Sequence, residues 1–172
     1  ALADAVTNAT IALHKQVSDS FLPTAVKFHY QFNLRELSAV FQGLMLSSPE
    51  YYTLPRTFAR LWLHEVYRVF GDRLTDVPDK EWFLGMMKET VTKSFSLKLE
   101  DICAHLVPEG AESKEITLNV MRNLIWGDFK VMGADPKLYD EFQDELLEGG
   151  AGIRKLIDDY LEEYNTMFAP MK

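Results

Sequence analysis

Apolar residues recur every three or four positions along most of this chain, and this spacing constrains its fold more than any other feature. Such a period places apolar side chains on one face of an α-helix. Near the N-terminus the pattern consists of Leu2, Val6, Ala9, Leu13, Val17 and Phe21. Pro23 then interrupts it, because proline cannot continue a helix. The sequence therefore predicts a first helix with one buried face.

A capping signal predicts the start of a second helix at Leu34. Asn33 and Glu36 stand three positions apart, the spacing at which each side chain can bond to the other's backbone N–H. Residues 28–32 are expected to form an extended approach to this helix. Its apolar stripe is expected to comprise Leu34, Leu37, Val40, Phe41, Leu44 and Met45.

Proline and glycine mark the limits of two further helices. Leu54 and Pro55 open the third, because proline is tolerated in the first turn, and Gly71 stops it. Asp76 and Pro78 open the fourth. Its predicted inward-facing residues are Trp82, Phe83, Met86, Val91 and Phe95.

The remainder of the chain is less regular. Residues 102–107 predict a short helix, residues 116–124 a helix or an extended piece, and residues 124–129 a buried connector. Asp135 and Pro136 are expected to open a helix that carries Tyr139, Phe142 and Leu146 and ends at Gly149 and Gly150. A last helix spans residues 153–168. The predicted fold class is all-α, a multi-helix bundle.

Composition excludes several kinds of partner. The 172 residues carry a formal net charge of −8, which disfavours nucleic acid and acidic membrane surfaces. No run approaches the roughly 20 apolar residues that span a bilayer. The single cysteine, Cys103, excludes an internal disulfide and is expected to be a buried thiol.

Motifs that carry catalysis are absent from the sequence. There is no glycine-rich phosphate loop with a Lys-Ser/Thr ending. The run that starts at His64 and Glu65 resembles the zinc motif H-E-x-x-H but ends in Arg68, which cannot ligate a metal. Glu65 and Arg68 are expected instead to form an exposed i,i+3 ion pair. We therefore expect no catalytic residue and no metal ligand.

Arg35 is the one residue that suggests a binding role. It lies in the first turn of the second predicted helix, where unpaired N–H groups and the helix dipole favour an anion. Its guanidinium could hold a phosphate with two hydrogen bonds. A solvated surface arginine is the alternative interpretation of the same position.

Several ordered blocks of this sequence resemble the dynein heavy chain family. The first comprises residues 22–38 and 41–43; the others are residues 61–65, 68–74 and 125–129. The form of residues 32–35 (FNLR) is similar to axonemal chains, and the residues before it are more similar to an outer-arm chain than to an inner-arm one. The resemblance covers nearly the whole chain, with residues 96–120 matching only loosely.

This resemblance implies a location within the motor. Residues 1–125 would be the helical lid of the third AAA+ module, and residues 126–172 a helical connector leading into the fourth. Arg35 would be the sensor-II arginine, which reaches the nucleotide in the adjacent large subdomain. Glu36 stands where an aspartate is more usual in the family.

The resemblance also implies cofactors, partners and location. ATP or ADP with magnesium would bind to the parent motor rather than to this segment alone, and the partners would be neighbouring large subdomains of the same heavy chain. Microtubules would be contacted only through the intact motor. The implied location is the cytoplasm and cytoskeleton, specifically the axoneme of a cilium or flagellum. Both ends of the chain are expected to be cuts in a longer polypeptide.

A different class of function fits the same composition. A free-standing acidic helical adaptor would bind other proteins through an exposed apolar face. Such an adaptor would have its own start and stop near these ends, whereas a lid would have a phosphate loop on each side. A small helical enzyme is disfavoured by the missing catalytic motifs.

Overall fold

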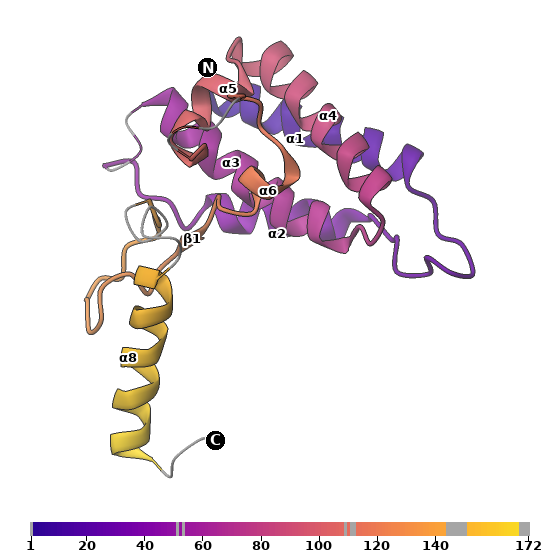
Figure 1. Ribbon diagram of the computed structural model, residues 1–172. Helices are drawn as coiled ribbons and strands as arrows, with labels where there is room; N and C mark the ends of the chain where they lie inside the picture. The colour runs from indigo at the N-terminus through magenta and orange to yellow at the C-terminus, as the bar shows by residue number, and fades with distance from the viewer. Residues whose placement is uncertain are drawn as a thin grey trace.

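The protein is a helical bundle followed by short turns, a small strand pair and a C-terminal helix (Figure 1). The computed structural model describes residues 2–50, 52, 54–108, 110, 113–143 and 151–168. Sheet in these residues is limited to two short paired strands. The predicted all-α fold class is therefore confirmed.

The bundle is built from α1 (Leu2–Ser20), α2 (Leu34–Leu44), α3 (Pro55–Val69) and α4 (Val77–Phe95). Helix α1 packs against α4, and α2 packs against α3. Trp62 of α3 is completely buried, and its indole Nε1–H donates to Thr10 Oγ1 of α1 at 2.8 Å. This bond satisfies a polar atom in the core, where an unpaired donor would be costly.

The helix limits follow the predicted signals closely. Pro55 occupies the first turn of α3, and Asp76 precedes α4 as its N-cap. At Gly71 the chain leaves α3 and tightens into the 3-10 turn η1 (Gly71–Arg73). A Cβ at Gly71 would lie 3.0 Å from the rings of both Phe83 and Tyr67, so a side chain here would require these rings to shift by a few tenths of an ångström.

Three short elements follow α4. They are α5 (Leu99–Ile102), the 3-10 turn η2 (Ala104–Leu106) and α6 (Leu118–Met121). The short helix predicted at residues 102–107 is thus divided between α5 and η2. The buried connector predicted at residues 124–129 contains the first strand, β1 (Trp126–Gly127), both residues of which are buried.

The helix predicted from Asp135 is wrong within the described residues. Residues 139–143 instead contain the strand β2 (Asp140–Glu141), which pairs antiparallel with β1 so that Trp126 lies opposite Glu141. Tyr139 and Glu141 bond to side chains of α3, and these tertiary contacts override the local helical pattern. Leu146, Gly149 and Gly150 lie outside the described residues.

Four residues expected to face the core are exposed. They are Trp82, Leu34, Met45 and Leu2, which are 64%, 77%, 82% and 37% exposed. Successive residues of a helix point about 100° apart, so the neighbouring Phe83 occupies the core while Trp82 faces outward. Leu34 is the first residue of α2 and Met45 its C-cap, so both lie at the ends of the buried stripe.

The predicted last helix is present as α8 (Ala151–Met167), which extends away from the bundle (Figure 1). The Tyr160 ring packs edge-on to Phe129 of the connecting segment at 6.5 Å. The helix leaves an apolar stripe exposed, formed by Ile157, Leu161, Tyr164 and Phe168. Among the described helices, none is both long and apolar enough to cross a membrane.

Candidate functional site

The predicted capping box fixes the start of α2. Asn33 Oδ1 accepts the N–H of Arg35 at 3.0 Å, and Glu36 Oε2 accepts the N–H of Asn33 at 3.0 Å. The cap already occupies the N–H of Arg35, so an anion here would meet the guanidinium rather than that backbone donor. The local sequence therefore determines where Arg35 stands on the molecule.

An open hollow of 390 Å³ lies beside this helix start. It is formed where α2 packs against the end of α3 and the turn η1. Its walls comprise Arg35, Glu36, Ala39, Arg68, Val69, Asp72 and Arg73. Three arginines and two carboxylates thus share one concave surface.

Arg73 closes one side of the hollow. Its Nη2 contacts Glu36 Oε1 at 2.7 Å, and its Nη1 donates to the carbonyl of Gln31 at 2.9 Å. Burial alone would raise the pKa of Glu36, but the Asn33 N–H and the Arg73 guanidinium outweigh it and lower that pKa. Arg73 therefore ties η1 to the approach and to the first turn of α2.

Arg68 is paired differently from the sequence prediction. It contacts Asp72, Nη1 to Oδ2 at 3.1 Å, and its guanidinium lies over the Tyr67 ring at 5.1 Å. The predicted exposed pair between Glu65 and Arg68 is wrong, because Glu65 is buried and bonds to Tyr139. Arg68 lies in the last turn of α3, and its guanidinium pairs with Asp72 of η1 rather than with Glu65 one turn earlier.

Arg35 is the arginine of the hollow without a carboxylate. Arg68 is neutralised by Asp72 and Arg73 by Glu36, whereas the exposed Arg35 side chain has no ion pair or hydrogen bond to the part of the chain described. The hollow therefore carries one uncompensated positive charge at a helix N-terminus. That arrangement suits an anion such as a phosphate.

Exposed apolar side chains lie in the segment that leads into this site. Val26, Phe28 and Leu34 are 85%, 70% and 77% exposed. Large apolar groups gathered on a short segment often mark a contact surface. Exposed apolar side chains thus lie on both sides of the approach, while Tyr30 and Phe32 within it are buried.

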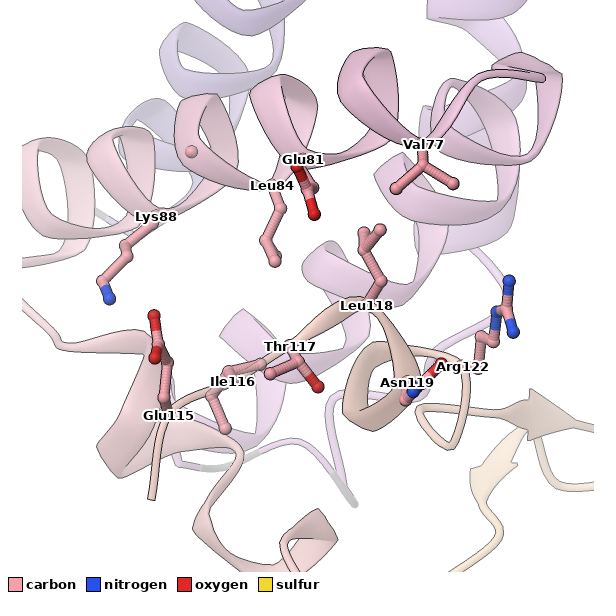
Figure 2. A pocket seen from close by; sticks show the side chains of 11 residues that line it. Val77, Glu81, Leu84, Lys88, Glu115, Ile116, Thr117, Leu118, Asn119 and Arg122 are labelled. Carbon is pink, nitrogen blue, oxygen red and sulfur yellow. The ribbon is translucent and has the colours of Figure 1, made fainter. Parts of the chain in front are cut away.

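A second, larger hollow lies between α4 and residues 115–122, as Figure 2 shows. It has a volume of 560 Å³ and a mixed lining, with Val77, Leu84 and Leu118 beside Glu81 and Arg122. Arg35 is not among its lining residues. Its acidic and basic groups are mixed, so it offers no single sign of charge to an ionic ligand.

Groups typical of catalysis are either buried or scattered. Burial raises the pKa of the Cys103 thiol to about 12, and burial lowers the pKa of His64 to about 4. Both groups are therefore uncharged at neutral pH. No cluster of three or more His, Cys, Asp or Glu residues suited to a metal ion is found among the described residues.

Sequence reasoning identified Arg35 and its cap but missed Arg73. Arg73 lies 37 positions after its partner Glu36, and neither periodicity nor a local motif connects them. They meet because η1 folds back against α2. Only the block of resemblance at residues 68–74 drew attention to this part of the chain.

The chain is similar to known proteins over most of its length. The AAA+ lid domain family matches residues 6–107, which include the whole hollow around Arg35. Mouse dynein axonemal heavy chain 3 is 39% identical over 164 residues, which is 95% of this chain and 4% of the relative. Pig dynein axonemal heavy chain 11 is 53% identical over 167 residues, 97% of this chain and 3% of the relative.

A sea urchin relative gives the same result over a shorter stretch. The ciliary dynein beta chain of Tripneustes gratilla is 52% identical over 94 residues, 55% of this chain and 2% of the relative. The chain spans only 2% to 4% of the length of these relatives. The chain belongs to the AAA+ lid domain family, in the form found in dynein heavy chains.

Proposed function

We propose that this chain is the lid that closes over a nucleotide held by the adjacent large subdomain of an axonemal dynein heavy chain. Within this proposal residues 1–125 are the lid of the third AAA+ module. Residues 126–172 are the connector into the fourth module, and the connector relays lid movement around the motor ring. The match to the lid family over residues 6–107 supports the first of these assignments.

The observation that carries the proposal is the unpaired guanidinium of Arg35 at the capped start of α2. The carboxylates of the hollow already neutralise Arg68 and Arg73, so Arg35 remains for a ligand from outside the chain. A charged hydrogen bond from arginine to phosphate contributes roughly 1.5–3 kcal/mol. In the parent motor the ligand would be ATP or ADP with magnesium.

Catalysis would come from the neighbouring large subdomain rather than from this segment. The chain contains no phosphate loop, so it is expected to hydrolyse no ATP alone. Its partners would be large subdomains of the same heavy chain, and the intact motor would bind microtubules. The words "axonemal" and "ciliary" in the names of the relatives support a location in the axoneme of a cilium or flagellum.

The proposal is tested by Arg35→Ala in the full-length polypeptide that contains this chain. Loss of one charged hydrogen bond should weaken nucleotide binding at this module by about 10- to 100-fold. Arg35→Lys should recover only part of the affinity, because an ammonium cannot form two parallel bonds. Nucleotide affinity at this module is measured by equilibrium binding of a fluorescent ADP analogue.

Arg154→Ala is the matched control, since Arg154 is an exposed arginine on α8, away from the hollow. It should leave nucleotide affinity unchanged. Circular dichroism should show equal helix content in all three variants, because Asn33 and Glu36 still cap α2. Unchanged affinity in Arg35→Ala would make Arg35 a solvated surface arginine.

A further inference from the structure

The far end of α2 packs against a buried carboxyl group. A Cβ added to Gly43 would lie 1.9 Å from Glu65 Oε2 of α3, so the carboxyl occupies the space that any side chain at position 43 would need. Glu65 is 6% exposed. The Glu65 head group therefore rests directly on the backbone of α2.

The other oxygen of the same carboxyl holds the hairpin segment, defined as residues 126–143. The Tyr139 hydroxyl donates to Glu65 Oε1 at 2.7 Å. Tyr52 in turn donates its hydroxyl to the Tyr139 carbonyl at 2.6 Å and accepts the Trp126 indole N–H at 2.9 Å. One carboxyl group thus touches α2 with one oxygen and the hairpin segment with the other.

A second polar anchor holds the hairpin segment without touching α2. Glu141 contacts Arg60 Nε at 3.0 Å and His105 Nε2 at 2.8 Å. Those partners belong to α3 and η2. The two anchors therefore differ in one respect: the one at Glu65 includes the helix that carries Arg35.

We propose that Glu65 is the joint that couples the Arg35 helix to the hairpin segment. A displacement of α2 at Gly43 moves the Glu65 carboxyl, and the Tyr139 hydroxyl transmits it to β2. This inference rests on the proposed function, because it assigns the route by which lid movement leaves α2. Glu65 is a positioning residue: it acts on Arg35 only through α2.

The test is hydrogen–deuterium exchange, followed by mass spectrometry, on the full-length polypeptide with Tyr139→Phe. Without nucleotide, amides of residues 40–44 and 139–142 should both exchange about 3- to 10-fold faster than in the wild type, since the net contribution of one side-chain hydrogen bond is lost. Tyr160→Phe is the matched control, because among the described residues Tyr160 makes a ring contact with Phe129 and no hydrogen bond through its hydroxyl. Unchanged exchange at residues 40–44 in Tyr139→Phe would overturn the proposal.

The second arm adds magnesium with ADP or with a non-hydrolysable ATP analogue. In the wild type, nucleotide should slow exchange in both α2 and the hairpin segment; in Tyr139→Phe it should slow exchange in α2 alone. An equal response of the hairpin segment in both proteins would overturn the proposal. If nucleotide leaves α2 unaffected in the wild type, the proposed function fails, and the nucleotide-free arm still decides whether Glu65 is the joint.

Two further variants separate coupling from simple loss of packing. Glu65→Gln keeps the shape and an oxygen for Tyr139, so it should behave like the wild type in both arms. Gly43→Ala should reproduce Tyr139→Phe, although alanine is the better helix former. Wild-type exchange in Gly43→Ala, or Tyr139→Phe-like exchange in Glu65→Gln, would contradict the assigned role of the carboxyl.

Discussion

The helical bundle is held together mainly by apolar packing, whereas the hairpin segment also depends on hydrogen-bonded carboxyl groups. In the bundle, α1, α3 and α4 meet through side chains such as Leu13, Trp62 and Phe83, all fully buried. The hairpin segment also buries Trp126 and Phe142, and the Trp126 ring lies 5.5 Å from that of His64 on α3. Its hydrogen bonds and ion pair with α3, however, are made through the carboxyl groups of Glu65 and Glu141. Apolar packing tolerates small adjustments, whereas each carboxyl contact needs a particular partner at a particular distance.

The largest effect should come from the bundle. Trp62→Ala should reduce the free energy of unfolding by about 3–5 kcal/mol, because it leaves a cavity between α1 and α3 and removes the partner of Thr10. The hairpin segment should be lost with the bundle, since its anchors are on α3. The measurement is urea unfolding, followed by circular dichroism and, with Trp82→Phe also present, by fluorescence of the remaining tryptophan, Trp126. Separate transitions for the two regions would show that the hairpin segment folds independently.

A smaller effect should appear at the junction of the two regions on acidification. His64 Nδ1 lies 2.9 Å from the Leu124 carbonyl, and burial lowers the pKa of His64 to about 4. The unfolded chain, with a His pKa near 6.5, takes up a proton first. Stability is therefore complete above about pH 6.5 and declines towards pH 4, by up to roughly 3 kcal/mol.

Two buried carboxyl groups, those of Glu65 and Glu141, also contribute to the dependence of stability on pH. Burial is the main effect on Glu65 and raises its pKa, so Glu65 opposes the loss as the pH falls. The pKa of Glu141 is lowered: burial would raise it, but the bond to His105 and the Arg60 charge outweigh this. The contribution of Glu141 is therefore lost as the pH falls from the ordinary pKa of glutamate towards the lower pKa of the folded state, because the unfolded chain takes up its proton first. In urea titrations from pH 7 to 5, His64→Gln should remove most of the dependence of the unfolding free energy on pH. The same dependence in His64→Gln as in the wild type would exclude His64 as its cause.

The smallest effect should come from the bundle surface. Trp82 is 64% exposed on α4, so Trp82→Ser should change the free energy of unfolding by less than about 0.5 kcal/mol. Phe83→Ser, one position along, should cost several times more because Phe83 is fully buried. If thermal unfolding shows equal decreases in the melting temperature of the two variants, Trp82 packs against the core.

The same contrast explains which parts of the fold could be predicted. The long helices follow from local signals: the apolar period from Val6 to Val17, Pro55 in a first turn, and the cap at Asn33 and Glu36. The prediction of which helix side chains face the core was wrong only at helix ends, as at Leu34, or by one position, as at Trp82. Within the candidate site, the position of Arg35 could be predicted from the sequence, because it depends on the cap at Asn33 and Glu36 alone.

The hairpin segment could not be predicted, because its structure depends on partners far away in the sequence. Tyr139 bonds to a residue 74 positions earlier, and Glu141 bonds to one 81 positions earlier. A local pattern of apolar residues after Pro136 favours a helix, and nothing in that pattern indicates the buried carboxyl of Glu65. Arg73 escaped notice for the same reason, since Glu36 reaches it only in the folded chain.

The glycine of α2 also determines how that helix could move. Gly43 lets α2 approach the Glu65 carboxyl, but Ala39 and Val40, one turn earlier along the helix, carry side chains, so sliding by one turn along α3 would bring a side chain into the carboxyl. A tilt about Gly43 would keep the glycine against the carboxyl. Arg35 lies eight residues away, about 12 Å along the axis. Under the proposed coupling, a tilt of α2 about Gly43 would convert a large displacement of the Arg35 guanidinium into a smaller displacement of the Glu65 carboxyl.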